Sequence, residues 1–440
     1  PNAVWGMTQA ASELVRSLHH LGVQFNVTDD DELDLRNFGG QKKKRTAFAQ
    51  SDTGKQLMTA LIDAVRREES AGTVERFPHH KFRTLLLSGN ICGGCTVQDT
   101  YTGELLRFVC DAVLIATGGL HGLFGDTTGS LANTGEVTAE LFRLGVPMAN
   151  LEMIQYHPTT VELGEKRMLL SEAARGEGGR LFALRNRKPW YFMEEKYPEL
   201  GNLMPRDITA REVWTVSRDY EVFLDMTELP KEVMEHKLAG LVDDCQTYLH
   251  KDIRKEPIPI LPGIHYFMGG IQVDERHRTS MRNLYAAGEC CAQYHGANRL
   301  GGNSLLGAIY GGQIAAETAC RETVSSPNMP CAEESLLPEL SPDAQMQMNR
   351  ILLNALGVVR DAQTLEAGIQ EIRKLSGTLS LLGCAMLESA LARKESRGAH
   401  WRADYPQRND AVYCKTTVAH WNGQHIAISF ESIPERRHDL

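Results

Sequence analysis

Four short segments carry polar side chains in otherwise apolar surroundings. The side chains are His157 in EMIQYHPTT, Ser171, Glu172 and Arg175 in LLSEAARGEGGR, His265 in PGIHYFMGG, and Arg299 in HGANRLGGNSLL. Taken singly, such a histidine is more often a core residue with satisfied hydrogen bonds than a ligand. As a set, cationic or hydrogen-bond-donating groups from four segments are suited to hold a small dicarboxylate. We therefore expect a small-molecule site in which Arg299 meets a carboxylate.

A fifth segment, LMPRDITARE, places Arg206 directly before Asp207. One interpretation is a surface ion pair, which is the common role of such neighbours. The other interpretation is catalytic: an arginine delivers a proton and recovers it through a nearby carboxylate. The residues alone leave both interpretations open.

Two apolar runs end in glycine in a way that suits a bound nucleotide. DAVLIATGG reads as a buried strand that ends at Ala116, Thr117, Gly118 and Gly119, where backbone can approach a ligand closely. NLYAAGE ends in Glu289, and a carboxylate at the C-terminal end of a strand can accept hydrogen bonds from ribose hydroxyls. Each motif alone also fits a solvated turn. Together they favour a nucleotide site.

The residues after Arg299 predict a long buried helix, SLLGAIYGGQIAAETAC, with Asn303 and Ser304 as caps. Gly301, just before it, lets the backbone approach whatever the helix end faces. Because the N-terminal end of a helix is electropositive, it is well placed to stabilise negative charge on a reduced flavin ring. Arg299 would then lie beside both a cofactor and a substrate.

The rest of the pattern indicates what holds these segments in place. Apolar residues at helical spacing predict helices over 7–21 and 52–65, and three short strands follow in FRTLLL, CTVQD and LLRFVC. Residues 151–264 are more polar and carry few strand signals, which suggests an inserted domain. Residues 324–342 are typical of a linker, and 343–396 predict helices. The last forty or so residues predict a polar tail with one strand pair.

Composition narrows the class of protein. The 440 residues suffice for two or three domains, and a formal net charge of -9 argues against a general nucleic-acid binder. No apolar run reaches the roughly 18 residues needed to cross a bilayer, and no secretory signal is visible, so we expect a cytoplasmic protein. The one Cys-x-x-Cys pair, Cys92 and Cys95, predicts two cysteines on a strand and no metal site. The basic run at residues 42–45 predicts a solvated loop.

The motifs QYHPT, SEAARGEGG, PRDITARE, HYFMGG, YAAGE and HGANRLGGNSLL occur in this order along the chain. In content and order they resemble the flavoprotein family of succinate dehydrogenase and fumarate reductase, which includes L-aspartate oxidase. The resemblance runs from about residue 7 to about residue 400. It implies an α/β fold with FAD as cofactor. The implied domains are a Rossmann-like FAD-binding domain (1–150 and 265–330), an inserted capping domain (151–264) and a C-terminal helical domain with a tail (343–440).

The resemblance also assigns roles residue by residue. The groups that resemble binders of the two substrate carboxylates are His157, Ser171, Glu172, His265 and Arg299. Arg206 resembles the proton-transfer arginine of the family, with Glu172 and Asp207 as its relay, and Arg175 is a further active-site candidate. The residues that resemble FAD contacts are Ala116, Thr117, Gly118, Gly119, Tyr266, Glu289, Gly301, Asn303, Ser304 and Leu305. The implied reaction is hydride transfer between flavin N5 and one carbon of fumarate or succinate, with proton exchange at the other carbon.

Within the family, FGGQKKKRTAFAQSDTGKQLM and HYFMGG are more similar to fumarate reductases than to aspartate oxidases. The implied partners are a small dicarboxylate and an iron–sulfur electron-transfer subunit. Contact with a membrane, at its inner face, would run through partner subunits. No Gly-x-Gly-x-x-Gly fingerprint occurs in the 440 residues, so we expect the chain as given to bind FAD poorly. Two alternatives stay open: L-aspartate oxidase and a flavin-free assembly subunit.

Overall fold

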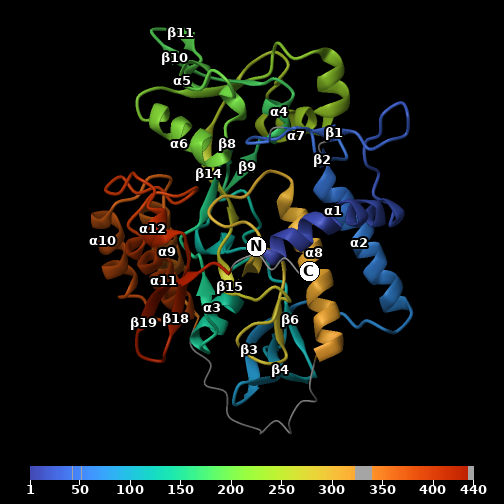
Figure 1. The fold of residues 1–440 in the computed structure, drawn as a ribbon, viewed down its shortest axis with the longest axis vertical. Coiled ribbons are helices and arrows are strands. Elements are labelled where there is room, and N and C mark those ends of the chain that lie inside the picture. The colour runs from blue at the N-terminus through green and yellow to red at the C-terminus, as the bar shows by residue number, and fades with distance from the viewer. Residues whose placement is uncertain (42, 51, 323–338, 435–440) are drawn as a thin grey trace.

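Figure 1 shows a computed structural model, which describes residues 1–41, 43–50, 52–322 and 339–434. A central part of sheets and helices carries a smaller unit at one end, and C-terminal helices flank it on one side. No helix within the described ranges is long and apolar enough to cross a membrane.

Two of the sequence predictions touch residues outside these ranges. Most of the expected linker, residues 324–338, lies outside the described residues. The same holds for Lys42 of the basic run, whereas Lys43, Lys44 and Arg45 are exposed, as a solvated loop requires.

Two amphipathic helices form one flank of the central part. They are α1 (Asn2–His20) and α2 (Thr53–Ser70), with the short strands β1 (Leu35–Arg36) and β2 (Thr46–Ala47) between them. Both helices lie where apolar spacing predicts them, although α1 begins earlier than expected. Asp52 occupies the N-cap of α2, but its side chain makes no capping hydrogen bond. Leu18, Phe25 and Leu57 are buried together and hold the two helices in contact.

The three predicted short strands form one antiparallel sheet. They are β3 (His80–Ser88), β4 (Ile91–Asp99) and β5 (Leu105–Val109), in that order. Cys92 and Cys95 both lie on β4 as free thiols, which confirms that the pair lies on a strand.

The two runs that end in glycine form neighbouring parallel strands. β6 (Val113–Ile115) pairs with β16 (Leu284–Ala286), so both runs end at the same edge, where ligands of α/β sheets bind. The prediction that the first run is buried is wrong in part. Leu114 is 43% exposed, and the exposed residues Ala116 and Thr117 follow it. The reason is that β6 has one hydrogen-bonded neighbour among the described residues, so its other edge is uncovered.

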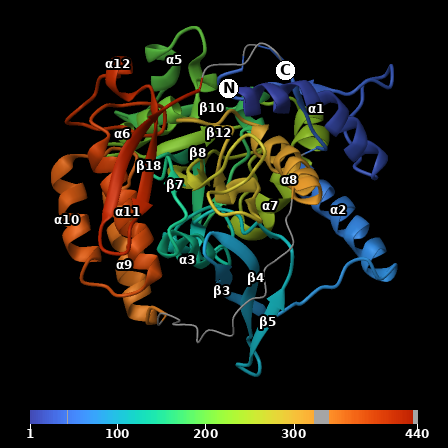
Figure 2. The same cartoon turned by 60° about the horizontal axis from the view of Figure 1, so that its bottom comes forward.

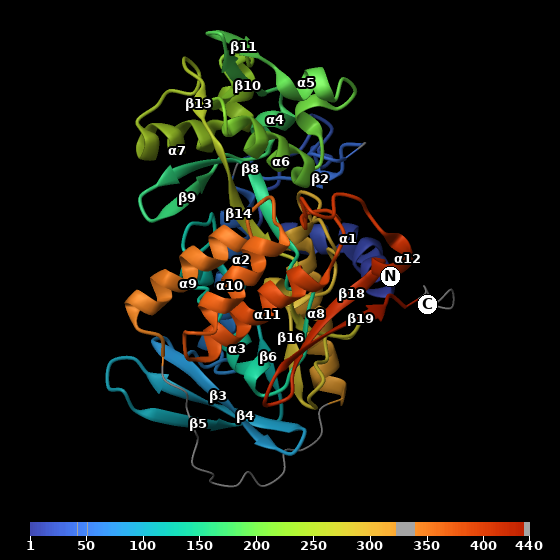
Figure 3. The same cartoon turned by 90° about the vertical axis from the view of Figure 1, so that its left-hand side faces the viewer.

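The upper unit, residues 154–259, stands above the central part (Figure 3). Its helices are α4 (Ala173–Gly176), α5 (Phe192–Lys196), α6 (Arg206–Ser217) and α7 (Ala239–Leu249). Its strands are β8 (Ile154–Leu163), β9 (Lys166–Leu169), β10 (Arg180–Arg185), β11 (Lys188–Trp190), β12 (Val222–Asp225) and β13 (Ile258–Pro259).

This region contains more strands than its sequence signals indicate. Four strands form a sheet in the order β11-β10-β12-β13. β8 pairs with β9 on one side and on the other with β14 (Leu261–Phe267), which leads back into the central part. Short strands with exposed charged residues, such as β11, lack the apolar alternation that marks a half-buried strand. A separate buried cluster that includes Leu181, Val213 and Leu224 forms the core of the upper unit.

The C-terminal region contains the predicted helices and the predicted strand pair. The helices are α9 (Pro342–Ala355), α10 (Ala362–Ile372), α11 (Thr378–Ala392) and the short α12 (Asp410–Tyr413), and the strands are β18 (Lys415–Trp421) and β19 (Ile426–Ser432). Helix α11 packs against α3 (Glu136–Arg143), and α9 and α10 pack against α11, as Figure 2 shows. Leu352 and Leu387 belong to the same buried cluster as Phe142 of α3. The proposed domain boundaries stay a prediction.

The strand pair does more than form a tail. β18 pairs with β7 (Met148–Ala149) and so extends a five-stranded sheet, β17-β15-β7-β18-β19, which also contains β15 (Gly270–Gln272) and β17 (Cys291–Ala292). Beneath it, Arg393 donates to Glu152 over 2.7 Å, and both side chains are fully buried. If one partner of a buried ion pair moves away, the other charge is left buried and unpaired, which is strongly destabilising. The pair therefore fixes the C-terminal segment against the start of β8.

Candidate active site

A cavity of about 380 Å³ lies where the upper unit meets the central part. This volume is within the usual range for small-ligand sites. Its lining contains half of the predicted site residues: His157, Ser171, Glu172, Arg206, His265, Arg299, Asn303, Ser304 and Leu305. The structure therefore brings together segments that lie up to about 150 residues apart in the sequence.

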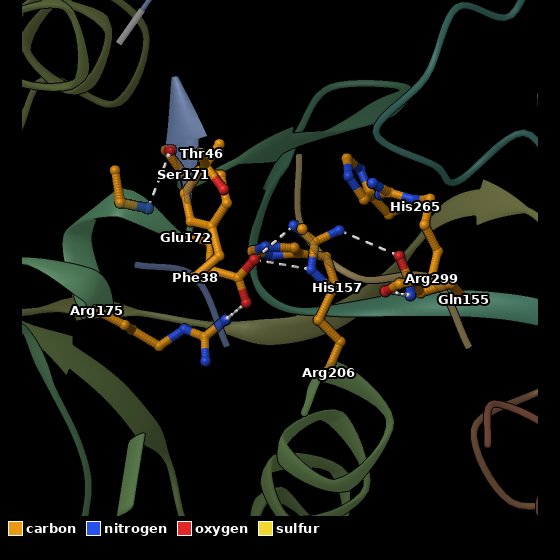
Figure 4. Close-up of polar contacts among 12 residues, drawn as sticks. Phe38, Thr46, Gln155, His157, Ser171, Glu172, Arg175, Arg206, His265 and Arg299 are labelled. Carbon is orange, nitrogen blue, oxygen red and sulfur yellow. Dashed lines mark hydrogen bonds and ion pairs between the residues drawn. The ribbon is translucent and has the colours of Figure 1, made fainter. Parts of the chain in front are cut away.

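Glu172 lies between two arginines (Figure 4). Its Oε2 accepts from Arg206 over 3.0 Å and 2.6 Å, and its Oε1 accepts from Arg175 over 2.9 Å. Although burial opposes ionisation, the guanidinium groups of Arg206 and Arg175 lower the pKa of Glu172 to about 2. The carboxylate is therefore an anion that hydrogen bonds to two cations. These hydrogen bonds connect Arg175 to Arg206 through Glu172 and so form a continuous path for a proton.

Arg206 is the first residue of α6, directly after Pro205, whose ring fixes the entry into the helix. Its third hydrogen bond runs from Nη1 to Oε1 of Gln155 over 3.1 Å. The guanidinium is 6% exposed and lines the cavity. It is thus held on two sides by protein acceptors while a third side faces the space where a substrate can bind.

The two predicted histidines lie side by side, with ring centroids 5.2 Å apart. Nδ1 of His157 lies 3.2 Å from the carbonyl and 3.3 Å from the amide of Thr159, and its Nε2 is buried without a hydrogen-bond partner among the described residues. Nδ1 of His265 lies 2.8 Å from the hydroxyl of Thr128. Burial, together with the charge of Arg206, holds the pKa of both histidines well below their usual range. Both rings are therefore neutral hydrogen-bond donors at physiological pH.

We predict that acid destabilises the protein through His157 and His265. Their folded-state pKa is depressed, so below about pH 6.5 the unfolded chain binds protons that the folded chain does not, and the free energy of unfolding falls by up to about 1.4 kcal/mol per pH unit for each histidine. Urea unfolding at about pH 7.5 and about pH 5.5 measures the loss. A variant with asparagine at both positions should show a shallower dependence on pH; an unchanged dependence would contradict the assignment.

Arg299 is buried without an anionic partner. Its side chain is 3% exposed, and its Cζ lies 4.3 Å from the centre of the Tyr266 ring. It makes no ion pair with any residue that the structure describes, and its Nε has no hydrogen-bond partner. Burial and the neighbouring Arg206 lower the pKa of Arg299 to about 9, so it remains a cation at neutral pH. A buried, unpaired guanidinium that lines a cavity is a binding site for an anion.

Of three further predicted site residues, Ser171 lines the cavity, whereas Arg175 and Asp207 lie outside its lining. The hydroxyl of Ser171 accepts from the amide of Ala173 at the start of α4. Arg175 does not line the cavity and acts on it through Glu172. The carboxylate of Asp207 accepts from Asn298 over 2.6 Å, and burial raises its pKa.

The predicted nucleotide motifs meet at the carboxyl ends of β6 and β16. The carboxylate of Glu289 accepts from the amide of Phe267 over 2.9 Å and lies against Gly119, where a Cβ would be 2.6 Å from Glu289 Oε1. Gly118 has a φ of +73°, a conformation that favours glycine. Ala116 and Thr117 are exposed beside them. The residues therefore fit a nucleotide: glycine backbone and a carboxylate lie together at an open strand edge.

The helix predicted after Arg299 is α8 (Asn303–Glu322), and its first turn lines the same cavity. Gly301 precedes it, and a Cβ there would lie 2.6 Å from Glu172 Oε2. The close approach of this loop to Glu172 thus requires glycine. Asn303, which the sequence predicts as a cap, is the first residue of the helix, and the predicted burial is wrong in part because Leu305 on the first turn is 39% exposed.

Sequence reasoning missed two amide side chains. Gln155 is fully buried and donates from Nε2 to Asn298 Oδ1 over 2.9 Å and to the Arg299 carbonyl over 2.8 Å. Both residues stand inside the motifs QYHPT and HGANRLGG, so their position between charged site residues was the available signal. A neutral amide gives no indication of its partner until the fold is known.

Comparison with known proteins is consistent with this geometry. Residues 1–305 match the family described as FAD binding domain, and residues 376–437 match that described as Fumarate reductase flavoprotein C-term. The succinate dehydrogenase flavoprotein subunit of Bacillus subtilis is 36% identical over 97% of this chain and 82% of its own length. The L-aspartate oxidase of Streptomyces coelicolor is 29% identical, over 99% and 81%. E. coli quinol fumarate reductase FrdA superposes with a TM-score of 0.85 at 25% identity, over 97% and 83%.

Fold and site together define an FAD-dependent oxidoreductase with an α/β core. The chain belongs to the succinate dehydrogenase and fumarate reductase flavoprotein family, and its enzyme class is the one that acts on succinate and fumarate. The predicted fold class and the predicted cofactor, FAD, are confirmed.

Proposed function

We propose that the protein interconverts fumarate and succinate as the flavoprotein subunit of a fumarate reductase or succinate dehydrogenase. The observation that carries the proposal is the excess of positive charge in the buried cluster around Glu172. Arg175, Arg206 and Arg299 contribute three buried cations, whereas Glu172 is the one acid in this group. The remaining two positive charges match the two carboxylates of a small dicarboxylate.

Arg299, His157 and His265 bind the substrate in this proposal. The guanidinium of Arg299 offers a fork of donors to one carboxylate, and Nε2 of neutral His157, which has no partner among the described residues, is free to bond to the substrate. His265 lies beside it, oriented by Thr128. Held from both ends, the substrate is fixed with its central carbons near Arg206, and such positioning lowers the barrier to reaction.

Arg206 acts as the proton donor for fumarate reduction. It hydrogen bonds to Glu172, and Glu172 bonds to Arg175, so a proton lost from Arg206 is replaced along Arg175 and Glu172. Arg206 and Glu172 are catalytic residues in this scheme, and Arg175 supplies the path. In the oxidation of succinate the same groups carry the proton away.

The residues that would hold FAD are those whose geometry fits a nucleotide. Glu289 and the 116–119 backbone are suited to the ribose and phosphate end, and the first turn of α8 is suited to the ring end. When bound, FAD supplies or accepts the hydride at its N5 atom. Tyr266 supports the ring end through its contact with Arg299.

The reaction of reduced flavin with fumarate tests this proposal. We expect the reconstituted protein to be yellow and its dithionite-reduced flavin to be reoxidised by fumarate under anaerobic conditions. A colourless protein that rejects FAD would favour the flavin-free assembly subunit. Reduced flavin that is indifferent to fumarate would overturn the substrate assignment.

L-aspartate oxidase is the second enzymatic candidate, favoured by the 29% identity to such an enzyme. It is distinguished by turnover of L-aspartate to the imino acid, with oxygen or fumarate as electron acceptor. In the dicarboxylate site proposed here, the ammonium group of aspartate would meet Arg206 as a like charge, so we expect no turnover.

We further propose that electrons reach the protein from an iron–sulfur subunit. The support is the similarity to subunits of succinate dehydrogenase and of quinol fumarate reductase. In such an assembly the protein lies at the cytoplasmic face of the membrane, and its membrane contact runs through its partners. Co-purification of the tagged chain with an iron-containing protein tests this arrangement.

We predict that Arg299→Gln weakens dicarboxylate binding by about 100-fold, because the loss of a buried charge from such a pair costs about 2–5 kcal/mol. The KM for fumarate and the dissociation constant of succinate, from the perturbed flavin spectrum, should rise together. The exposed Arg282 offers the control: Arg282→Gln should leave both constants unchanged. An unaffected dissociation constant in Arg299→Gln would remove this residue from the site.

A further inference from the structure

A ring of hydrogen bonds connects the proposed proton donor to the proposed carboxylate anchor. Arg206 Nη1 donates to Gln155 Oε1 over 3.1 Å, and Gln155 Nε2 donates to Asn298 Oδ1 over 2.9 Å and to the Arg299 carbonyl over 2.8 Å. Asn298 Nδ2 then donates to Asp207 Oδ1 over 2.6 Å. Because Asp207 follows Arg206 in α6, the ring closes on itself. Figure 4 shows Gln155 between Arg206 and the Arg299 segment.

The ring joins three elements that are distant in sequence. Gln155 is on β8, Asp207 is in the first turn of α6, and Asn298 is in the segment between β17 and α8. Figures 1 and 3 show α6 within the upper unit, whereas α8 belongs to the central part. The bond between Asn298 and Asp207 therefore crosses from one unit to the other, next to the cavity.

The geometry of Asp207 favours positioning over proton transfer. Among the described residues, no hydrogen bond or ion pair joins its carboxylate to the Arg206 guanidinium, whose acid partner is Glu172. The side-chain partner of Asp207 is the amide of Asn298, which has no exchangeable charge to pass on. A relay through Asp207 would thus have to cross groups that do not ionise.

A second contact ties the same two elements from outside. The amide of Ala399 donates to the Ala297 carbonyl over 2.8 Å, and Gly398, with φ of +55°, is so close that a Cβ would lie 2.3 Å from that oxygen. Two residues further on, the ring of Trp401 lies 4.0 Å from the Arg211 guanidinium on α6. The loop after α11 therefore touches both the 297–299 segment and α6.

We propose that Asp207 and Asn298 form a latch that holds α6 against the segment carrying Arg299, so that Arg206 and Arg299 act on the same bound substrate. Both are positioning residues, and Gln155 transmits the position of one arginine to the other. The proposal rests on the proposed function, because the reaction is what requires the two arginines together.

Matched substitutions at position 207 separate a latch from a relay. Asp207→Asn removes the titratable group but keeps an oxygen for Asn298 to donate to, so we expect kcat to stay within about fivefold of wild type and the pH profile to keep its shape. Asp207→Ala removes the acceptor and should lower kcat/KM by about 10–100-fold with unchanged flavin content. A relay makes the opposite prediction: both variants inactive, with one limb of the pH profile lost.

Exchanging the donor and the acceptor of the hydrogen bond between Asn298 and Asp207 tests the role of Asn298. Asn298→Asp places two carboxylates at hydrogen-bond distance and should lower kcat/KM by a factor similar to that of Asp207→Ala. Adding Asp207→Asn to Asn298→Asp restores one donor and one acceptor, so the double variant should recover at least about tenfold. No recovery, together with normal flavin binding, would overturn the latch.

The wild-type protein separates failure of the inference from failure of the function. If fumarate does not reoxidise the wild-type reduced flavin, the proposed function is wrong. If the wild type reacts and Asp207→Asn does not, only the latch is wrong. Thermal unfolding of each variant shows whether a loss of activity reflects loss of the folded state.

Discussion

Arg206→Ala is expected to abolish fumarate reduction while the protein retains its flavin. Arg206 lines the cavity, donates twice to Glu172 and once to Gln155, and none of the residues that fit the nucleotide is among its hydrogen-bond partners. Loss of a general acid costs about 10²–10⁴ in rate, and the substitution also removes one of the buried positive charges that hold the substrate. The flavin-to-protein ratio from absorbance and the rate of flavin reoxidation by fumarate measure the two effects separately.

Arg218→Ala provides the matched control for Arg206→Ala. Arg218 is exposed directly after the last residue of α6, so its removal changes the charge of the same element without reaching the cavity. It should leave turnover and flavin content unchanged. Loss of flavin from Arg206→Ala would count against the assigned role, because it would place the arginine in cofactor binding or in folding. Substantial residual turnover would move the proton donor elsewhere.

The sequence was sufficient to predict several residues that line the cavity, because they lie in short motifs with a distinct chemistry. His157, Glu172, His265 and Arg299 each stand in an apolar or glycine-rich setting, and all four line one cavity in the structure. The parallel pairing of β6 with β16 was also predictable, since both strands end in glycine and a ligand motif.

What the sequence did not reveal depends on partners that are far away along the chain. Gln155 joins two arginines, but a neutral amide can bond to almost any polar group, so its role appears only when β8, α6 and the Arg299 segment are placed together. The upper unit shows few strand signals because short strands such as β11 bury little apolar surface. Likewise, β18 joins β7 across about 270 residues, and no local pattern specifies that register.

Because two buried arginines depend on its charge, Glu172 is the acid of the site whose substitution should have the largest effect. Arg175 and Arg206 both donate to its carboxylate, and the side chains of Arg175 and Glu172 are 0% and 2% exposed. If the carboxylate were neutral, two guanidinium groups would be buried together without the anion that separates them. Breaking a buried pair by removing one partner costs about 3–5 kcal/mol, far more than the loss of an exposed pair.

Glu172→Gln is therefore expected to lower the free energy of unfolding by about 3–5 kcal/mol and kcat by about 10²–10³-fold. Because the folded pKa of Glu172, about 2, lies below its unfolded value, the stabilisation by the carboxylate is present above about pH 4.5 and is lost as the pH falls toward 2. The difference in the free energy of unfolding between variant and wild type, measured with urea, should therefore become smaller as the pH falls. Glu194→Gln, which breaks the half-exposed pair with Arg180, is the control and should cost less than about 1 kcal/mol. An equal cost for both substitutions would show that Glu172 is not the charge that holds the two arginines in place.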